Sequence, residues 1–409
     1  MLLKPHHSSA TSGSNKDLKR KAGFFLLITV FALLVTNSAD SNPSGFRHQL
    51  RTKNLILEGR AYYGWTLDHH IEMTPFTRHY PAYEISLFKA TYGKARWEFM
   101  YNYPFVGMSF WYSDLGRTSA LGSGFALFPF INFPLMNREG FNFYFRLGVG
   151  LGYITKPYDR YKNYENIAIG SHINGAVNLL LEARWRMGRK FMASTGLGLM
   201  HFSNGAIKLP NYGLNIPCVT AALSYRLTRE NVYLKRKLLP QLYTFEFDNR
   251  RYLNFDVSAV MGVKDMEATL GSGNTFMVYN IFGNMTWPVG YKSHFGFGLD
   301  VSYDGSDETL LKMNDIEPEH WINLVKTGLT VAYELSFSRM SIMLNMGSYL
   351  SGLDKTDGYV YEKLALRVGI TKDLFGTIQL KAHYAKADFV GFGVGYRLHL
   401  KYYDKKHKW

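Results

Sequence analysis

The chain has 409 residues, enough for two ordinary domains or one large barrel, and a formal charge of +15 at pH 7. Its lysines and arginines are scattered, which argues against nucleic acid as a partner and favours an anionic lipid surface. The single cysteine, Cys218, excludes a disulfide framework and CxxC metal sites. The 29 Tyr, 29 Phe and 38 Gly, without a long apolar run, suit a membrane β-barrel better than a soluble globule.

The first patterned segment is a basic stretch followed by an apolar one. Basic residues at 19–21 precede the apolar run Ala22–Val35, and the small residues Ser38 and Ala39 follow. This run is shorter than the roughly 20 residues that span a bilayer as a helix. The pattern therefore predicts a secretory signal peptide over residues 1–39 rather than a membrane anchor.

From residue 55 onward, apolar and polar side chains alternate. In residues 141–153 every odd position is Phe, Leu, Val or Tyr, whereas the even positions hold Gly, Asn, Arg and Tyr; residues 390–400 repeat the pattern. One apolar face and one Gly-rich polar face are typical of a barrel wall between lipid and a polar lumen. A soluble β-sandwich would alternate too, but its polar face should be rich in Lys, Glu and Thr. We therefore predict an all-β protein with an antiparallel transmembrane β-barrel.

The alternation divides into about sixteen strands in two eight-stranded parts. The first part, within residues 50–230, has its third strand at 95–111, and the second occupies residues 251–409. The basic join at 229–250 interrupts the alternation. The pattern leaves open whether the strands close as one large barrel or as two eight-stranded units.

Long polar loops alternate with short turns along this series. Segments 155–171, 204–214 and 304–320 are long, whereas 187–190 is short. Outer-membrane barrels have short periplasmic turns and longer external loops. The strand at 191–203 is therefore expected to run outward and to end near the external leaflet.

That strand ends on a polar pair. His201 and Ser203 share the face of Leu197 and Leu199, because side chains alternate with period two. The same parity places Asn215 on the apolar face of the next strand, at 215–228. In an antiparallel hairpin, the three polar residues would converge on the outer surface. A hydroxyl beside a base that is oriented by a third polar group is the arrangement that activates a serine nucleophile.

The stretch around this pair resembles the lipid A 3-O-deacylase (PagL) family of Gram-negative outer-membrane enzymes. The matching residues are the H-x-S-N of 201–204, then Pro210-Asn211, Gly213 and the downstream strand that ends in Tyr225. The resemblance covers roughly residues 55–230. It implies an eight-stranded barrel that hydrolyses the ester-linked 3-hydroxyacyl chain of lipid A, with neither a metal nor another cofactor.

The resemblance also implies a role for each polar residue. Ser203 would be the nucleophile and His201 the general base. The candidate oxyanion donors would be Asn204 and the backbone amide of Gly205, because the developing negative charge needs preorganised hydrogen bonds.

The chain departs from the family at the third member of the triad. Well-known members have a glutamate there, and the matching residue here is Asn215. An amide can fix the imidazole tautomer but cannot stabilise the imidazolium by charge. Two possibilities follow: Asn215 is the third catalytic residue, or it is structural and another acid, such as Glu182 on the preceding strand, completes the triad.

The second part faintly parallels the first. The stretch that ends in His383 and Ala385 aligns with the stretch that ends in His201 and Ser203. Because alanine stands where a serine would be needed, this part is predicted to lack the activity. A degenerate repeat and convergence on a generic barrel-strand pattern explain the parallel about equally well.

The sequence thus predicts a serine acyl-ester hydrolase in the outer membrane of a Gram-negative bacterium. Its substrate would be lipid A or lipopolysaccharide, surrounded by outer-membrane lipid. One alternative is a non-catalytic barrel, either porin-like or lipid-binding, and another is an acyl hydrolase of glycerophospholipids. A metal site at His69, His70 and His79 lacks supporting carboxylates or cysteines at a fixed spacing. The acyl position and the oligomeric state do not follow from the sequence.

Overall fold

The computed structural model describes residues 55–91, 96–138, 140–227, 251–266, 275–290, 292–354 and 356–402. The predicted signal peptide and the join at 229–250 lie outside the described residues. Among the residues that are described, no helix is both long enough and apolar enough to cross a membrane.

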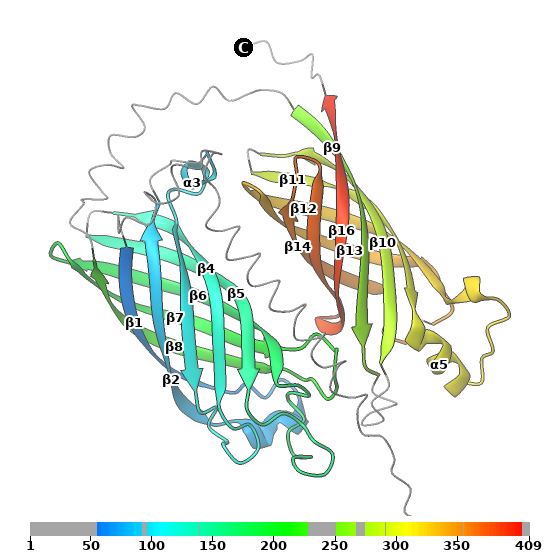
Figure 1. The fold of residues 1–409 in the computed structure, drawn as a ribbon, viewed down its shortest axis with the longest axis horizontal. Coiled ribbons are helices and arrows are strands. Elements are labelled where there is room, and N and C mark those ends of the chain that lie inside the picture. The colour runs from blue at the N-terminus through cyan, green and yellow to red at the C-terminus, as the bar shows by residue number, and fades with distance from the viewer. Residues whose placement is uncertain are drawn as a thin grey trace, which may run out of the picture. The chain divides into compact units, whose positions relative to one another are not determined.

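The first eight strands form a closed antiparallel barrel (Figure 1). Each strand pairs with the next in the chain, and the last closes on the first, with Ala61 opposite Ala221. The strands are β1 (Leu55–Trp65), β2 (His79–Ala90), β3 (Phe105–Ser113), β4 (Gly124–Asn137), β5 (Phe141–Ile154), β6 (Ile173–Met187), β7 (Phe191–Ser203) and β8 (Leu214–Arg226).

The next eight strands form a second closed barrel. The closing pair joins the first and last of these strands, with Ala259 opposite Val394. Two barrels of eight strands therefore confirm the predicted fold class and settle how the sixteen strands close. The strands are β9 (Arg251–Lys264), β10 (Phe276–Pro288), β11 (Ser293–Asp304), β12 (Val325–Phe337), β13 (Met340–Ser351), β14 (Val360–Gly369), β15 (Leu374–His383) and β16 (Lys386–Tyr402).

Each barrel has a long-loop end and a short-turn end. In the first barrel, the long-loop end carries the β1–β2, β3–β4, β5–β6 and β7–β8 connections, and the first of these contains the short helix η2 (Ile71–Phe76). In the second barrel it carries the β11–β12 connection, with α5 (Gly305–Met313) and η5 (Trp321–Leu324). The β2–β3 connection is long although it lies at the short-turn end.

That connection corrects one predicted strand. The third strand begins at Phe105 rather than at residue 95, because Arg96–Met100 forms the short helix α3. Asn102 and Tyr103 then adopt positive φ values of 55° and 60°, which turn the chain away from an extended path. Pro104 follows without an N–H to give to a ladder.

The strands alternate as predicted between an apolar outer face and a polar inner face. On β7, Leu197 is 66% exposed, whereas its neighbours on the inner face, Met200 and Phe202, are fully buried. Leu223 on β8 is likewise exposed on the outside. The outward orientation of this wall, predicted from parity alone, is confirmed.

Charged residues fill the lumen of the first barrel. Three buried arginines face three buried glutamates, so the charges balance within a water-poor interior. The ion pairs are Arg60 with Glu58 and Glu182, Arg146 with Glu58 and Glu84, and Arg184 with Glu58 and Glu182.

Candidate functional site

The three polar residues singled out in the sequence meet at the long-loop end of the first barrel. The antiparallel register places His201 on β7 directly opposite Asn215 on β8. Their side chains join through a hydrogen bond of 2.6 Å between His201 Nδ1 and Asn215 Oδ1. Ser203 lies two residues beyond His201 on the same face. All three side chains are partly exposed, on the wall that carries Leu197.

The hydrogen bond to Asn215 sets the chemistry of the imidazole. Because an amide oxygen only accepts, Nδ1 of His201 carries the hydrogen, and the neutral ring keeps its lone pair on Nε2. That is the tautomer which a general base needs. Asn215 therefore holds the ring in one orientation but contributes no negative charge.

A second histidine supports Asn215 from the β1–β2 connection. His69 Nδ1 lies 3.4 Å from Asn215 Nδ2, and its Nε2 lies 2.9 Å from the carbonyl oxygen of Tyr212. His79 is placed elsewhere, with its ring stacked on Tyr63. In the sequence His69 is 146 residues from Asn215, and no spacing signalled that the two would meet.

Two N–H groups hold the hydroxyl of Ser203. The backbone amide of Gly205 donates to Ser203 Oγ at 3.1 Å, and Asn211 Nδ2 donates to it at 2.9 Å. These bonds use the two acceptor positions of the oxygen and leave its O–H as a donor. The described side chains of His201 and Ser203 share no hydrogen bond in this conformation.

Gly213 keeps a gap between the base and the serine. Its φ is +82°, and a Cβ at this position would lie 3.2 Å from His201 Cε1 and 3.9 Å from Ser203 Cβ. Both side chains therefore border the same small space, which a larger residue would fill. Only glycine adopts this backbone angle without strain.

The candidate oxyanion donors differ in what they contact. The Gly205 amide faces Ser203, as described above, whereas Asn204 is buried and turned inward. Asn204 Nδ2 donates to Ser171 Oγ at 2.9 Å and to the Lys208 carbonyl at 2.7 Å, so both of its amide hydrogens are used. The side-chain donor beside Ser203 is instead Asn211. Parity explains the difference, because residue 204 continues the inward-facing series of β7.

Glu182 is not the missing acid. In the register it lies opposite Gly196, in the middle of β7, and it points into the lumen. It is bound there by Arg60 at 2.5 Å and by Arg184 at 2.8 Å. The possibility that Glu182 completes the triad is therefore wrong, since it lies on the face of the wall opposite to His201.

The parallel histidine of the second barrel has a different setting. His383 is buried in the lumen, with Nε2 hydrogen-bonded to the hydroxyl of Tyr349 at 3.0 Å. Asp357, His383 and Asp388 offer ligand atoms within 4.8 Å of one another, a spacing that could hold a metal ion. Asp388, however, is already paired with Lys264 at 2.5 Å.

Two family models match the chain, one on each barrel. Residues 82–226 match the family described as lipid A 3-O-deacylase (PagL). Residues 253–400 match the family described as acyloxyacyl hydrolase, C-terminal domain. The first barrel therefore contains a PagL-family domain, and the second contains an acyloxyacyl hydrolase C-terminal domain. The resemblance inferred from the motif at 201–213 is thereby confirmed, and both family descriptions are those of ester hydrolases.

Solved structures are similar at low identity. The crystal structure of the outer membrane enzyme PagL corresponds to 40% of this chain and 97% of its own, with 16% identity and a TM-score of 0.29. A triple mutant of Rhodopseudomonas blastica porin corresponds to 84% of this chain and 100% of its own, with 6% identity and a TM-score of 0.16. Among curated proteins, none matches the chain. The assignment of the first barrel to the PagL family rests on the family models.

Proposed function

We propose that the chain is a serine hydrolase of the Gram-negative outer membrane that removes an ester-linked acyl chain from lipid A. The observation that carries the proposal is the hydrogen bond of 2.6 Å between His201 Nδ1 and Asn215 Oδ1. It fixes a basic Nε2 two residues from Ser203, on an outward face. A histidine that merely ended a strand would need no such orientation.

The first step transfers the acyl chain to the enzyme. When Ser203 Oγ turns toward His201 Nε2, the imidazole accepts its proton and Oγ attacks the ester carbonyl carbon. A bond forms between Oγ and this carbon, and the carbonyl oxygen becomes negative. The Gly205 amide and Asn211 Nδ2, which hold the resting hydroxyl, are then free to donate to this oxygen.

The second step returns the enzyme to its resting state. The tetrahedral intermediate collapses and breaks the bond between the carbonyl carbon and the sugar oxygen, which takes the proton from His201. Water then attacks the acyl-enzyme, with His201 again as the base, and releases the fatty acid and the free serine hydroxyl. Asn215 holds the ring through both steps, and the imidazolium forms without a neighbouring carboxylate.

The position of the site suits a lipid substrate. His201 and Ser203 end β7 above Leu197, which is exposed on the outer wall. The ester of an acylated glycolipid lies at the boundary between headgroup and acyl chains, so a nucleophile at the end of a membrane strand meets it without extracting the lipid. Lipid A and the outer membrane are proposed on this basis together with the PagL-family domain.

The direct test is mass spectrometry of lipid A incubated with the purified chain in detergent. The wild type should produce lipid A that is lighter by one ester-linked acyl chain. Ser203→Ala and His201→Ala should each lower the rate by about 10⁴-fold or more, because a nucleophile and its base act as a unit. Neither side chain lies in a packed core, so both variants should keep the folded, heat-modifiable barrel.

A matched control is Thr195→Ala, which removes another outward hydroxyl from the same strand. Thr195 Oγ1 donates to the Thr220 carbonyl at 2.8 Å, away from His201. Loss of the Thr195 hydroxyl should leave the rate of deacylation unchanged.

The proposal fails if folded Ser203→Ala deacylates lipid A as fast as the wild type. Release of fatty acid from glycerophospholipids but not from lipid A would identify the alternative substrate, and no release from either would identify a non-catalytic barrel.

A further inference from the structure

A glycine lies beside Ser203 on the outer wall of the first barrel. The register of β6 and β7 places Gly175 directly opposite Ser203, and Gly175 is exposed on the outer face. The other outward positions of β6 around it carry apolar side chains, namely Ile173, Val177, Leu179 and Leu181. One position in this apolar row is therefore empty, and it is the position next to the proposed nucleophile.

Neither the backbone nor the packing of β6 requires a glycine at this position. The φ of Gly175 lies outside the positive range that favours glycine. Among the described residues beyond its chain neighbours, a Cβ on Gly175 would have one atom within 4 Å, the Ser203 carbonyl oxygen at 3.3 Å. On the lumenal face, by contrast, a Cβ on Gly148 would lie 2.6 Å from the Phe128 ring. A glycine inside a strand weakens it and often marks a place where a ligand approaches closely.

The apolar surface beside Ser203 lies on the side of β6 and β5. In the register, the outward pairs on this side are Val177 with His201, Leu179 with Leu199, Leu151 with Gly175 and Val149 with Val177. On the other side of β7, His201 is paired with the polar Asn215. An acyl chain whose ester group meets Ser203 therefore has an apolar surface to contact on the β6 side and a polar group on the β8 side.

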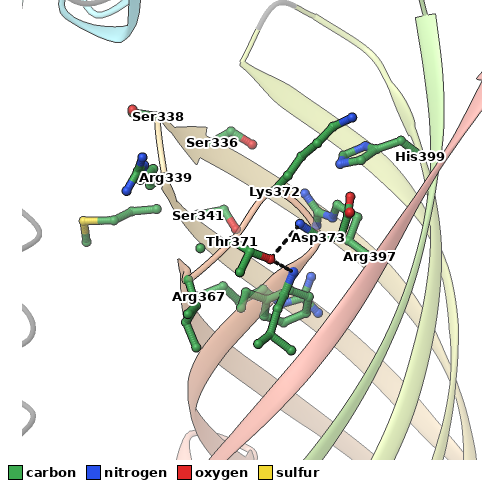
Figure 2. A pocket seen from close by; sticks show the side chains of 15 residues that line it. Ser336, Ser338, Arg339, Ser341, Arg367, Thr371, Lys372, Asp373, Arg397 and His399 are labelled. Carbon is green, nitrogen blue, oxygen red and sulfur yellow. Dashed lines mark hydrogen bonds between the residues drawn. The ribbon is translucent and has the colours of Figure 1, made fainter. Parts of the chain in front are cut away.

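The cavity at the short-turn end of the second barrel provides no comparable surface (Figure 2). Its volume is about 510 Å³, and the side chains that line it include Arg339, Lys372 and Asp373. An acyl chain that entered this cavity would displace water from these charged groups, which costs free energy. The open position at Gly175 is instead continuous with the apolar outer wall.

We propose that Gly175 is a specificity-determining residue, which allows the acyl chain of an ester to pass from Ser203 onto the outer face of β6 and β5. The inference rests on the proposed function, because it assigns the place of the acyl chain at the same site. Without a side chain at residue 175, the first carbons of the chain lie against the strand while the ester carbonyl reaches Ser203. A long chain continues along the apolar wall, whereas an acetyl group ends before it.

The test compares esters of different chain length in Gly175→Ala and Gly175→Leu. The substrates are p-nitrophenyl acetate and p-nitrophenyl myristate, and the release of p-nitrophenol by the full chain is measured in detergent. Gly175→Leu should lower the ratio of kcat/KM for the myristoyl ester to kcat/KM for the acetyl ester by about tenfold or more, because the new side chain obstructs the long chain. Gly175→Ala adds only the Cβ and should lower this ratio less.

Gly59→Leu is the matched control. Gly59 also faces outward, from β1, and in the part of the chain that the structure describes a Cβ there would meet nothing within 4 Å. This variant should keep the ratio of the wild type. The inference is overturned if folded Gly175→Leu keeps that ratio, if the two leucine variants lower it equally, or if Gly175→Leu loses both esters alike, which would assign the effect to a displaced Ser203.

A binding measurement separates this inference from the proposed reaction. Lipid A retained by the Ser203→Ala variant is measured by native mass spectrometry from detergent, with and without Gly175→Leu. Retention should fall by about tenfold with Gly175→Leu and should not fall with Gly59→Leu. If the wild type cleaves no ester but retention falls in this way, the proposed hydrolase fails and the acyl-chain site stands. Unchanged retention overturns the acyl-chain site, whether or not the wild type is active.

Discussion

The third residue of the candidate triad, Asn215, can orient the imidazole of His201 but cannot stabilise a positive charge on it. Asn215 holds the His201 ring through one hydrogen bond of 2.6 Å, as a carboxylate would. It cannot, however, offset the positive charge that the ring would acquire in the proposed attack by Ser203. His69 lies beside Asn215, with its Nδ1 3.4 Å from the amide nitrogen of Asn215 and 3.1 Å from the Leu67 carbonyl oxygen. Asn215 thus sets the tautomer of His201 without supplying a negative charge.

This arrangement predicts opposite effects of two substitutions at Asn215. Asn215→Ala should lower the deacylation rate by about 10- to 100-fold, because the ring loses its orienting partner but the nucleophile and base remain. Asn215→Glu should raise the rate, because a carboxylate stabilises the imidazolium. It should also move the acidic limb of the pH–rate profile to higher pH, since the protonated ring, which is inactive as a base, becomes easier to form.

The measurement is the initial rate of lipid A deacylation as a function of pH for the wild type and both variants. In every case activity should fall on acidification, as His201 becomes protonated. An unchanged profile for Asn215→Glu in folded protein would mean that residue 215 does not act on His201. We make no prediction for the pH profile of an Asn204 variant. The Asn204 amide bonds Ser171 and the Lys208 carbonyl, so its loss would disturb the loop and not only His201.

At the scale of elements, Gly213 in the β7–β8 connection leaves the space that the His201 ring occupies. Gly213→Ala should lower the deacylation rate by roughly tenfold or more, because the new Cβ would lie 3.2 Å from His201 Cε1 and would displace the ring. Gly140→Ala is the matched control: its φ of +84° imposes similar strain, but nothing lies within 4 Å of the new Cβ. Both variants should lose about 1 kcal/mol of stability from the backbone angle.

Only Gly213→Ala should lose activity, which steady-state rates and heat-modifiability of the same samples would check. Equal losses in the two variants would assign the effect to strain in the barrel and not to the position of the base.

The helix α5 is predicted to respond to pH. One cation, Lys326, serves two carboxylates, with its Nζ 2.9 Å from Asp307 and 3.0 Å from Asp354. Burial raises the pKa of Asp307 to about 7, and the neighbouring charges of Asp304 and Asp354 act in the same direction against Lys326. The folded helix therefore holds a proton that the unfolded segment loses near pH 4. The resulting stability is complete below that pH and is lost as pH rises through about 7.

Hydrogen exchange measures this loss locally. Protection factors of the α5 amides, corrected for the intrinsic pH effect, should fall by up to about tenfold per pH unit between pH 5 and 7. Asp307→Asn, which cannot titrate, should show nearly constant protection over the same range. Constant protection in the wild type would contradict the raised pKa of Asp307.

Strands and helices could be predicted from the sequence where the alternation of neighbouring side chains alone defines them. The bounds of β7 agree with the predicted 191–203, because alternation alone defines a strand that faces lipid on one side. The helix at Arg96–Met100 was missed because five residues contain too little periodicity to distinguish a helix from a strand. His69 was missed as a partner of Asn215, because a contact between a loop and the end of a distant strand leaves no pattern in either segment.

At the scale of the molecule, the alternation of side chains could not determine whether the sixteen strands close into one barrel or two. Every strand of a sixteen-stranded barrel and of two eight-stranded barrels shows the same outward and inward faces. The choice is made by which strands pair at the seam, β8 with β1 and β16 with β9. Each lumen then has its own buried charges, such as Arg146 with Glu84 in the first barrel and Arg397 with Asp256 in the second.

Both barrels should therefore depend on an apolar outer wall. Leu197 on β7 is 66% exposed and Leu299 on β11 is 62% exposed, each near the middle of its strand. Leu197→Arg or Leu299→Arg should each destabilise the barrel folded in a bilayer by about 2–4 kcal/mol, because a charge in the apolar band is poorly solvated. The controls are Ile71→Arg and Ile322→Arg. Ile71 is 85% exposed and Ile322 is 60% exposed, both in connections at the long-loop ends, so these two substitutions should change stability little.

Urea titration of the chain folded into vesicles measures these free energies. A loss at Leu197 and not at Leu299 would place only the first barrel in the membrane. Losses as large in the two control variants would assign the effect to charge itself rather than to position on the wall. If all four variants fold like the wild type, neither wall faces lipid, and the route by which Ser203 meets a membrane ester would have to be sought on another surface. The prediction of two lipid-facing barrels thus bears directly on the proposed hydrolase, because its catalytic strand uses the same outer face.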